Sequence, residues 1–377
     1  AKIKTEGFDS HGVSFSGGID AETITTYCKT GVACPSGAKY AVYSFTAGGA
    51  DKAVYFDNFG REIQTKVQTL SGWSYTDTKY NSQGKPWKVS EPYFANQTKY
   101  WNETFYDKLR RTDYTKQAAG GITDISYQGL TTVTTDAAGQ KKTSTKDYAG
   151  NLVKVKDHYN KELVYSYDAY GNLLTAKVND KTQVTNTYNA YGKKRTTNDL
   201  DKGLWSYTYN ALGQLKTQKT ARTHETELFY DDLGRKKRRV DPEGTTCWYY
   251  DTYKDNKAKF SIGKLTEIRQ YNSFRSSCPS LTATDHQYAE QYKYASNGKV
   301  QTRTVTFEGQ QYASHTFYDE YSRVRNVVYP RLGMNVRNEY SKGYLHKVYN
   351  NASNDADFGK LLKHVSAVNA RGHATTV

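Results

Sequence analysis

The chain has few of the residues from which ordinary globular cores are built. Apolar residues make up 36% of its 377 positions, against about 45–50% in an average globular protein. Proline occurs six times and methionine once. No apolar run approaches the roughly 18 residues of a membrane span. These shortages argue against one thick apolar core, and we predict no membrane span.

The sequence also lacks the short motifs of common catalytic and metal sites. It has no P-loop, GxSxG, GxGxxG, HExxH or GGxGxD element. Its eight histidines are scattered, and most aspartates fall in expected turns. We therefore predict no catalytic residue, no metal site, no cofactor and no enzyme. An enzyme with a site spread over the loops 251–261 and 275–285 is the alternative, and no motif supports it.

The four cysteines do not form a metal-binding knuckle. Cys28 and Cys34 are six residues apart, and Cys247 and Cys278 are 31 apart, so neither spacing is CxxC. We interpret them as free or buried thiols. A local disulfide between Cys28 and Cys34 is the alternative, and it would require an oxidising compartment.

Positive charge is in excess, with a net charge of +15. Such a balance fits nucleic acid, an anionic membrane surface, an acidic protein partner or simple solvation. The basic residues are spread along the chain, and the densest run, 235–239, directly follows an expected turn. We favour dispersed, solvated charge and expect no nucleic-acid partner.

Tyrosine and glycine are the abundant residues. There are 35 Tyr against 13 Phe and 5 Trp, together with 29 Gly. A tyrosine buries its ring while its hydroxyl stays hydrogen-bonded or wet. Glycine then provides the turns that the scarce prolines do not. This composition favours broad β-sheets with partly solvated faces.

Internal periodicity is the clearest signal in the sequence. The segment YDAYGN at 167–172 recurs as YNAYGK at 188–193, YNALGQ at 209–214 and YDDLGR at 230–235, a step of 21 residues. Looser copies begin at Phe56, Tyr80, Tyr106, Tyr294 and Tyr318, and a weaker series that includes 240–245 lies halfway between. One period is therefore one hairpin of two strands and their turns.

The turn chemistry fits this period. Asp or Asn followed three positions later by Gly is the preference of a type I turn, and a glycine with positive φ then makes a bulge that sets the returning strand's register. The predicted turn residues are Asp57, Gly60, Asn81, Gly84, Asp107, Asp168, Gly171, Asn189, Gly192, Asn210, Gly213, Asp231, Gly234, Asp241, Gly244, Gly298 and Asp319.

An aromatic residue opens most of these turns. The repeat tyrosines are Tyr80, Tyr106, Tyr167, Tyr188, Tyr209, Tyr230, Tyr294 and Tyr318. We expect tyrosines one unit apart to stack across strands, with each pair contributing roughly 0.2–1 kcal/mol.

Taken together, the pattern predicts an all-β fold. Each hairpin pairs with the next, and strand twist makes the array coil into a spiral sheet, a partial cocoon around a volume. We expect a repeat shell over 54–345, an irregular β segment that caps it over 1–53, and a trailing repeat-like segment over 346–377. Because the pattern is already running at both ends, we interpret the chain as a fragment of something longer.

On these repeats, the chain resembles the RHS or YD-repeat family. The stretches 54–62 and 203–214, VYFDNFGRE and GLWSYTYNALGQ, are in that family's style. The resemblance implies a non-catalytic, hollow β-shell that encloses a C-terminal toxin in secreted or cell-surface bacterial toxins of the Rhs and Tc types. The implied partners are an N-terminal delivery region and a C-terminal toxin of the same polypeptide, and secretion-system or toxin-complex components.

The sequence departs from the bacterial members in one respect. Their shell usually ends in a self-cleaving aspartyl protease region with paired Asp-Pro-x-Gly elements, whereas this chain has only 241–244, in a repeat turn. We therefore expect the cleavage region and toxin to be absent from it. A carbohydrate- or surface-binding repeat module is the alternative, since exposed aromatics in repeats also bind glycans. The only dense cluster is 248–250, Trp-Tyr-Tyr.

Overall fold

In the computed structural model, residues 2–5, 21–28, 33–252, 260–351 and 359–377 are described. Parts of the expected cap, of the 251–261 loop and of the trailing segment therefore lie outside the described residues. The chain divides into two compact units. One comprises 1–121, 293–303 and 312–377, and the other comprises 122–292 and 304–311.

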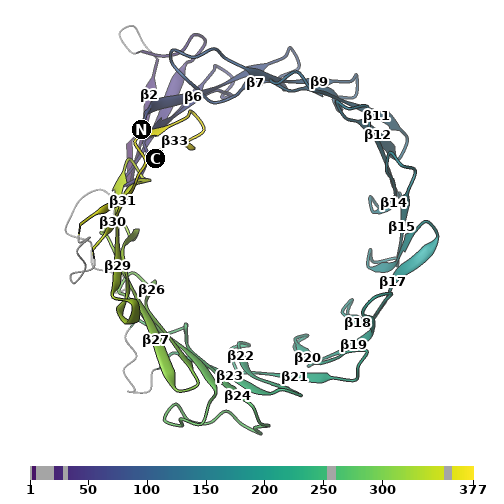
Figure 1. The fold of residues 1–377 in the computed structure, drawn as a ribbon. Coiled ribbons are helices and arrows are strands. Elements are labelled where there is room, and N and C mark those ends of the chain that lie inside the picture. The colour runs from purple at the N-terminus through teal and green to yellow at the C-terminus, as the bar shows by residue number, and fades with distance from the viewer. Residues whose placement is uncertain (1, 6–20, 29–32, 253–259, 352–358) are drawn as a thin grey trace. The chain divides into compact units, whose positions relative to one another are not determined.

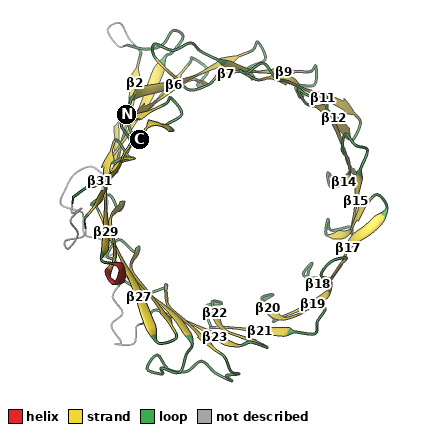
Figure 2. Ribbon diagram, in the orientation of Figure 1, coloured by secondary structure: helices red, strands yellow, loops and turns green. Residues whose placement is uncertain are grey.

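The first unit consists of antiparallel strands joined mostly by tight turns, with one short 3-10 helix (Figure 2). Its elements are β1 (Lys2–Thr5), β2 (Ala21–Tyr27), β3 (Tyr40–Thr46), β4 (Lys52–Phe56), β5 (Glu62–Thr69), β6 (Gly72–Tyr80), β7 (Pro86–Ser90), β8 (Tyr93–Phe94), β9 (Trp101–Tyr106), β10 (Thr112–Lys116), β28 (Val324–Tyr329), η1 (Pro330–Leu332), β29 (Met334–Ser341), β30 (Tyr344–Asn350), β31 (Leu361–His364), β32 (Ala367–Val368) and β33 (Ala374–Thr376). Most neighbours in sequence pair, but β6 pairs with both β7 and β8, and β7 pairs with β9.

The second unit is a regular meander in which each strand from β11 to β24 pairs antiparallel with the next (Figure 1). Its strands are β11 (Ile122–Gln128), β12 (Thr131–Thr135), β13 (Lys141–Lys146), β14 (Leu152–Lys156), β15 (Glu162–Tyr167), β16 (Leu173–Val178), β17 (Lys181–Tyr188), β18 (Lys194–Asp199), β19 (Gly203–Tyr209), β20 (Leu215–Lys219), β21 (Glu225–Tyr230), β22 (Lys236–Asp241), β23 (Gly244–Tyr250) and β24 (Leu265–Tyr271). Three further strands belong partly to each unit: β25 (Tyr288–Tyr294), β26 (Val300–Phe307) and β27 (Gln310–Tyr318). The prediction of an all-β hairpin array is confirmed.

A register shift recurs at the tyrosine that ends each of β15, β17, β19 and β21. Ser166 faces Thr175, but the next residue, Tyr167, faces Leu173, so one extra residue is accommodated on β16. The same shift occurs at Tyr188, Tyr209 and Tyr230. This one-residue bulge resets the strand after every repeat turn and keeps all repeats in the same register.

Strand alternation gives the sheet two different faces. Over β15–β20 one face carries cross-strand hydroxyl pairs, Ser166 with Thr175 and Thr187 with Thr196, at 2.6 Å each. The opposite face carries the repeat tyrosines, because successive residues of a strand point to opposite sides.

Both faces remain largely open. Few described side chains are buried, and most residues of strands such as β15 and β16 are only half-buried. Among the described residues, buried apolar side chains gather in a single small cluster with Ala41, Ala53 and Tyr55 at its centre. The described part of the sheet is therefore held together mainly along its strands and turns.

In the first unit, segments far apart in sequence lie side by side. Lys342 Nζ donates to the Thr69 carbonyl at 3.2 Å, and Ser74 Oγ donates to the Ala370 carbonyl at 2.6 Å. Gly48 has φ +68° and presses on the Tyr321 ring, where a Cβ would lie 2.3 Å from the nearest ring atom. Early and late repeats of the array are thus in direct contact within this unit.

Candidate functional site

The repeat turns share one geometry, which Asp168 illustrates. Its Oδ1 accepts hydrogen bonds from the backbone N–H groups of Tyr170 and Asn172, both at 2.9 Å. Gly171 N–H closes the turn on the Asp168 carbonyl at 3.1 Å. The Asn172 amide donates to Asp168 Oδ2 at 2.8 Å, and this bond leads the effects that lower the pKa of the Asp168 carboxyl. The aspartate therefore caps its own turn and is not free for chemistry.

Equivalent side-chain caps occur at many other predicted turns. At each of these turns the side-chain oxygen of the Asp or Asn accepts hydrogen bonds from the backbone N–H groups two and four residues later. The residues are Asp57, Asn81, Asp107, Asn189, Asn210, Asp231 and Asp319. The glycines Gly60, Gly84, Gly192, Gly213 and Gly234 follow with positive φ. Arg110 and Ser322 take this left-handed position with φ 64° and 60°, where most copies have glycine.

Two predicted turns are built differently. Asp241 and Gly244 pair directly across a two-residue hairpin, and Gly244, with φ +135°, lies so close to β24 that a Cβ would meet the Tyr271 carbonyl oxygen at 2.0 Å. In the turn of Gly298, whose φ is also positive, the closing hydrogen bond runs to the carbonyl of Ala295, which stands where other copies have Asp or Asn.

The repeat tyrosines form a ladder of hydroxyl-to-backbone hydrogen bonds. Tyr209 OH donates to the Lys194 carbonyl at 2.8 Å, and Tyr230 OH to the Leu215 carbonyl at 2.9 Å. Equivalent bonds run from Tyr80, Tyr106, Tyr167, Tyr188 and Tyr318. In each case the acceptor lies close after the preceding turn. Each tyrosine therefore fastens its repeat to the one before it.

The expected tyrosine–tyrosine stacking is wrong for the regular repeats. Tyr167, Tyr188, Tyr209 and Tyr230 take part in no recorded ring pair in the described chain. The reason is geometric, because tyrosines one unit apart are two strands, or roughly 9.6 Å, apart. Ring pairs need centroids about 4.5–7 Å apart.

At several turns the residue after the left-handed position makes a second bridge, to the next repeat, which the sequence analysis missed. The Arg61 guanidinium lies 4.5 Å from the centre of the Tyr80 ring, and Arg323 takes the same place over Tyr340. The Gln214 amide donates to the next turn, at the Gly234 carbonyl 3.0 Å away, whereas the amides of Asn151 and Asn172 donate to the aspartate of their own turns. The signal was present in the sequence, because this position holds Arg, Lys, Asn or Gln in copy after copy.

Arg235 combines both roles. It donates from Nε to Asp231 Oδ2 at 2.7 Å and from Nη2 to Asp251 Oδ2 at 2.9 Å, and its guanidinium stacks 4.2 Å from the Tyr250 ring centre. Hydrogen bonds with Asp251 and Asp231 raise the pKa of the guanidinium. The densest basic run of the sequence thus begins at a residue that is already paired.

The interpretation of the cysteines as free or buried thiols is wrong, and the alternative of a local disulfide between Cys28 and Cys34 is confirmed. Cys28 is bonded to Cys34, and Cys247 to Cys278. The second disulfide ties β23 to the loop 272–287. Arg269, only 1% exposed, holds the same loop by donating to the Ala283 carbonyl at 2.8 Å.

The aromatic cluster at 248–250 is not an exposed platform. Tyr249 donates its hydroxyl to the Pro279 carbonyl at 2.8 Å beneath this loop, and burial raises the pKa of its phenol. Tyr250 belongs to the tyrosine ladder, with its hydroxyl 2.9 Å from the Lys236 carbonyl. Within the described ranges, no group of three or more His, Cys, Asp or Glu side chains is placed to hold a metal ion, and no helix is long and apolar enough to cross a membrane.

Comparison with known proteins agrees with this architecture. Residues 209–246 match the RHS Repeat family. A solved structure of the Photorhabdus luminescens Tc holotoxin pore, in a mutant form, superposes with a TM-score of 0.72 at 15% identity, over 89% of this chain and 20% of that one. The TcdB2-TccC3-TEV crystal structure gives 0.66 at 15% identity, over 94% and 20%. TcdB2-TccC3 itself gives 0.56 at 14%, over 89% and 24%.

This chain therefore spans about a fifth of the length of the first two chains. No curated protein sequence matches it. At these identities the likeness is one of fold, and that fold is the RHS-type β-sheet of the Tc toxin structures.

Proposed function

The chain is an RHS-type repeat protein with the fold of the Tc toxin structures. We propose that it forms a segment of the wall of a β-shell, and that this shell encloses a C-terminal toxin in a secreted bacterial toxin. In this proposal residues 54–345 form the wall, and residues 1–53 and 346–377 flank it, the former as a cap. The partners are an N-terminal delivery region and the toxin in the same polypeptide, and other components of a toxin complex.

The observation that carries the proposal is the way the sheet is held together. Tyrosine hydroxyls bond successive repeats together, post-turn side chains such as Gln214 add further bridges, and few described side chains are buried. A sheet fastened in this way can extend repeat by repeat without a second layer, which a wall requires and a compact binding domain does not.

The wall is proposed to be non-catalytic because its carboxylates are committed to structure. Asp168 caps a turn, and Asp231 and Asp251 neutralise Arg235. Catalytic acids and bases instead need a group whose proton or lone pair faces a substrate.

Small-angle scattering on the purified chain tests the wall. A compact globule of this length should have a radius of gyration near ~21 Å, and we expect a clearly larger value. A radius at the compact limit would sink the open-wall proposal for this chain.

A protection assay tests enclosure separately. A destabilised passenger protein is fused after Val377, and its digestion by a broad-specificity protease is timed. Protection of at least about tenfold is expected relative to the same passenger fused before Ala1. Equal digestion rates in the two fusions would contradict enclosure while leaving the scattering result intact.

A further inference from the structure

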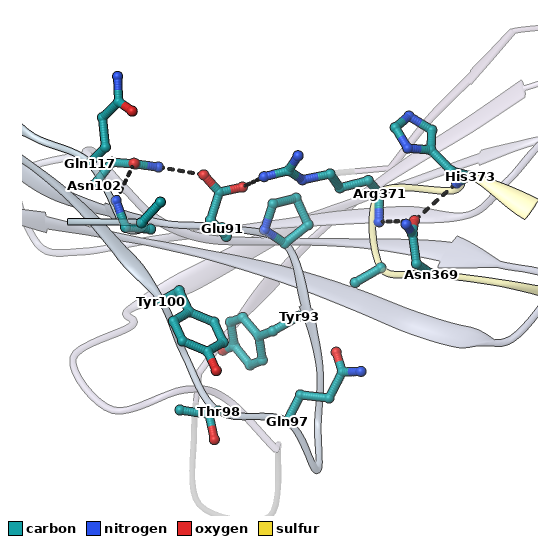
Figure 3. A pocket seen from close by; sticks show the side chains of 14 residues that line it. Glu91, Tyr93, Gln97, Thr98, Tyr100, Asn102, Gln117, Asn369, Arg371 and His373 are labelled. Carbon is teal, nitrogen blue, oxygen red and sulfur yellow. Dashed lines mark hydrogen bonds and ion pairs between the residues drawn. The ribbon is translucent and has the colours of Figure 1, made fainter. Parts of the chain in front are cut away.

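A pocket of about 950 Å³ lies within the first unit. Its walls come from the segment 91–102 around β8 and the start of β9, the turn 117–119, and the turn 369–373 between β32 and β33 (Figure 3). The volume is within the roughly 300–1,000 Å³ of sites that bind small molecules. Neither the turn ladder nor the wall proposal requires such a cavity.

The two sides of the pocket are fastened together. Val368 N–H donates to Ser71 Oγ at 2.8 Å, and Ser74 Oγ donates to the Ala370 carbonyl at 2.6 Å. Across the pocket, Arg371 forms an ion pair with Glu91 (Figure 3). The late turn is thus fixed against the early segment without a ligand, so the cavity is preformed.

The pocket's charges are balanced internally. Besides Arg371, the Asn102 amide donates to Glu91 Oε1 at 2.7 Å, and these two contacts lower the pKa of the Glu91 carboxyl. Asn102 Oδ1 in turn accepts from Ala118 N–H at 3.0 Å. A cation and an anion that already satisfy each other offer little net attraction to a charged ligand.

The remaining lining combines an exposed aromatic ring and uncharged polar groups with His373 and small apolar side chains such as Pro92 and Ala118. Tyr100 is 60% exposed and lies beside Tyr93 in Figure 3, with Thr98 and Gln97 on the same side. Tyr93 is 6% exposed, because its ring stacks on Tyr75 at 5.7 Å. The Gln97 side-chain carbonyl accepts from Phe94 N–H at 3.0 Å, which fixes the loop beneath Tyr100.

We infer that this pocket binds a short, neutral oligosaccharide. A pyranose presents a flat C–H face, which packs on an exposed tyrosine ring, and a rim of hydroxyls that both donate and accept. The amides of Gln97 and Gln117 and the hydroxyl of Thr98 match that rim, because each carries a donor and an acceptor. An apolar ligand would offer these groups no hydrogen bond in place of the water it displaces, at a cost in affinity.

The pocket lies partly within the proposed wall, at 91–119, and partly in the flanking segment, at 369–373. None of its lining residues is a rung of the tyrosine ladder on which the wall depends. A failure of the scattering experiment therefore leaves the saccharide site standing, and the reverse also holds.

Isothermal titration of the whole chain with maltotriose, cellotriose and N-acetylchitotriose tests the inference, with a sulfated heparin disaccharide as the charged comparison. At least one neutral trisaccharide should bind with a Kd below about 5 mM, since single-platform sites are weak. Tyr100→Ala should weaken that binding at least tenfold, while Tyr100→Phe, which keeps the ring, should weaken it less than threefold.

The matched control is Tyr170→Ala, which removes a tyrosine that is 92% exposed in a repeat turn far along the sequence. It should leave the titration unchanged. Circular dichroism verifies that each variant is folded, and if Tyr100→Ala is not, Gln117→Ala takes its place with the same expected direction. The inference is overturned if no neutral probe binds, if the heparin disaccharide binds more tightly, or if the Tyr100 and Tyr170 variants behave alike.

Discussion

The Tyr209 hydroxyl donates a hydrogen bond to the carbonyl oxygen of Lys194, 2.8 Å away and fifteen residues earlier in the chain. Tyr188 makes the corresponding bond to Leu173, but there the same carbonyl also accepts from the Asn186 amide at 3.0 Å. Removing the Tyr188 hydroxyl therefore leaves the Leu173 carbonyl bonded to Asn186, whereas removing the Tyr209 hydroxyl takes this hydrogen bond from the Lys194 carbonyl.

Tyr209→Phe should cost about 1–1.5 kcal/mol of unfolding free energy, because it removes the hydroxyl from the Lys194 carbonyl. Tyr188→Phe should cost less, about 0.5 kcal/mol, since Asn186 still serves its acceptor. Urea unfolding measures both. The control Tyr191→Phe, at a tyrosine 88% exposed, should have no measurable effect. Equal losses for Tyr209 and Tyr191 would show that the ladder adds nothing to stability.

The left-handed turn position can be tested by two opposite substitutions, one that removes a glycine and one that introduces a glycine. Gly213→Ala should destabilise the chain by about 1 kcal/mol, because its φ of +75° strains any Cβ. Arg110→Gly should stabilise it by about 0.5 kcal/mol, since φ at Arg110 is 64°. Thermal melts of both variants, compared with the parent chain, show whether each substitution raises or lowers stability. A loss of stability in Arg110→Gly would mean that the arginine's other contacts outweigh its backbone strain.

Stability should fall in acid because turn aspartates have lowered pKa values. Asp168 is one of these, with its pKa depressed chiefly by the Asn172 amide and by backbone N–H bonds. A depressed folded-state pKa contributes stability above the unfolded value of about 3.9, and this is lost as pH falls through the folded pKa.

Asp168→Asn isolates that contribution, because Asn189 already caps an equivalent turn through Oδ1. The variant should lose less stability than the parent between pH 6 and 3 in urea titrations. Parallel pH profiles would indicate that Asp168 makes no net contribution in acid.

The disulfides should differ in their effect on stability. The link between Cys247 and Cys278 spans 31 residues, and that between Cys28 and Cys34 spans six. Chain-entropy arguments give about 3–4 kcal/mol for the longer loop and about 2 kcal/mol for the shorter.

Replacing Cys247 and Cys278 together by Ala should therefore lower the urea midpoint more than replacing Cys28 and Cys34. It should also speed proteolysis within 272–287, mapped by mass spectrometry. If this loop resists cleavage in the Cys247/Cys278 variant as it does in the parent, the side-chain hydrogen bonds of Arg269 and Tyr249 to its backbone carbonyls are sufficient to hold it.

Much of the fold could be predicted from the sequence because its information is local. A turn such as 168–171 needs only an Asx residue and a glycine three apart, and the 21-residue step repeats it. The alternation of Tyr207 and Thr208 in β19 then indicates a strand with two unlike faces. Short-range steric and hydrogen-bonding preferences are sufficient for each of these inferences.

The unpredicted features all depend on residues brought together by the sheet. Cys278 meets Cys247 only because the 272–287 loop folds back over β23. The pocket joins Glu91 to Arg371 across 280 positions, with no motif at either end. Stacking of the repeat tyrosines was predicted from their spacing alone, without the two-strand separation that prevents it.

The ladder also has a genetic consequence. Since Tyr167, Tyr188, Tyr209 and Tyr230 each reach back fifteen residues to a backbone carbonyl, each of these repeats is fastened to the one before it in the same way. Unequal recombination that copies 21 residues would give the new unit the same partners, whereas insertion of a single residue in a strand would turn its tyrosine to the opposite face. We therefore expect evolution to keep variants that gain or lose whole repeats of the meander far more often than variants with one or a few residues inserted in a strand.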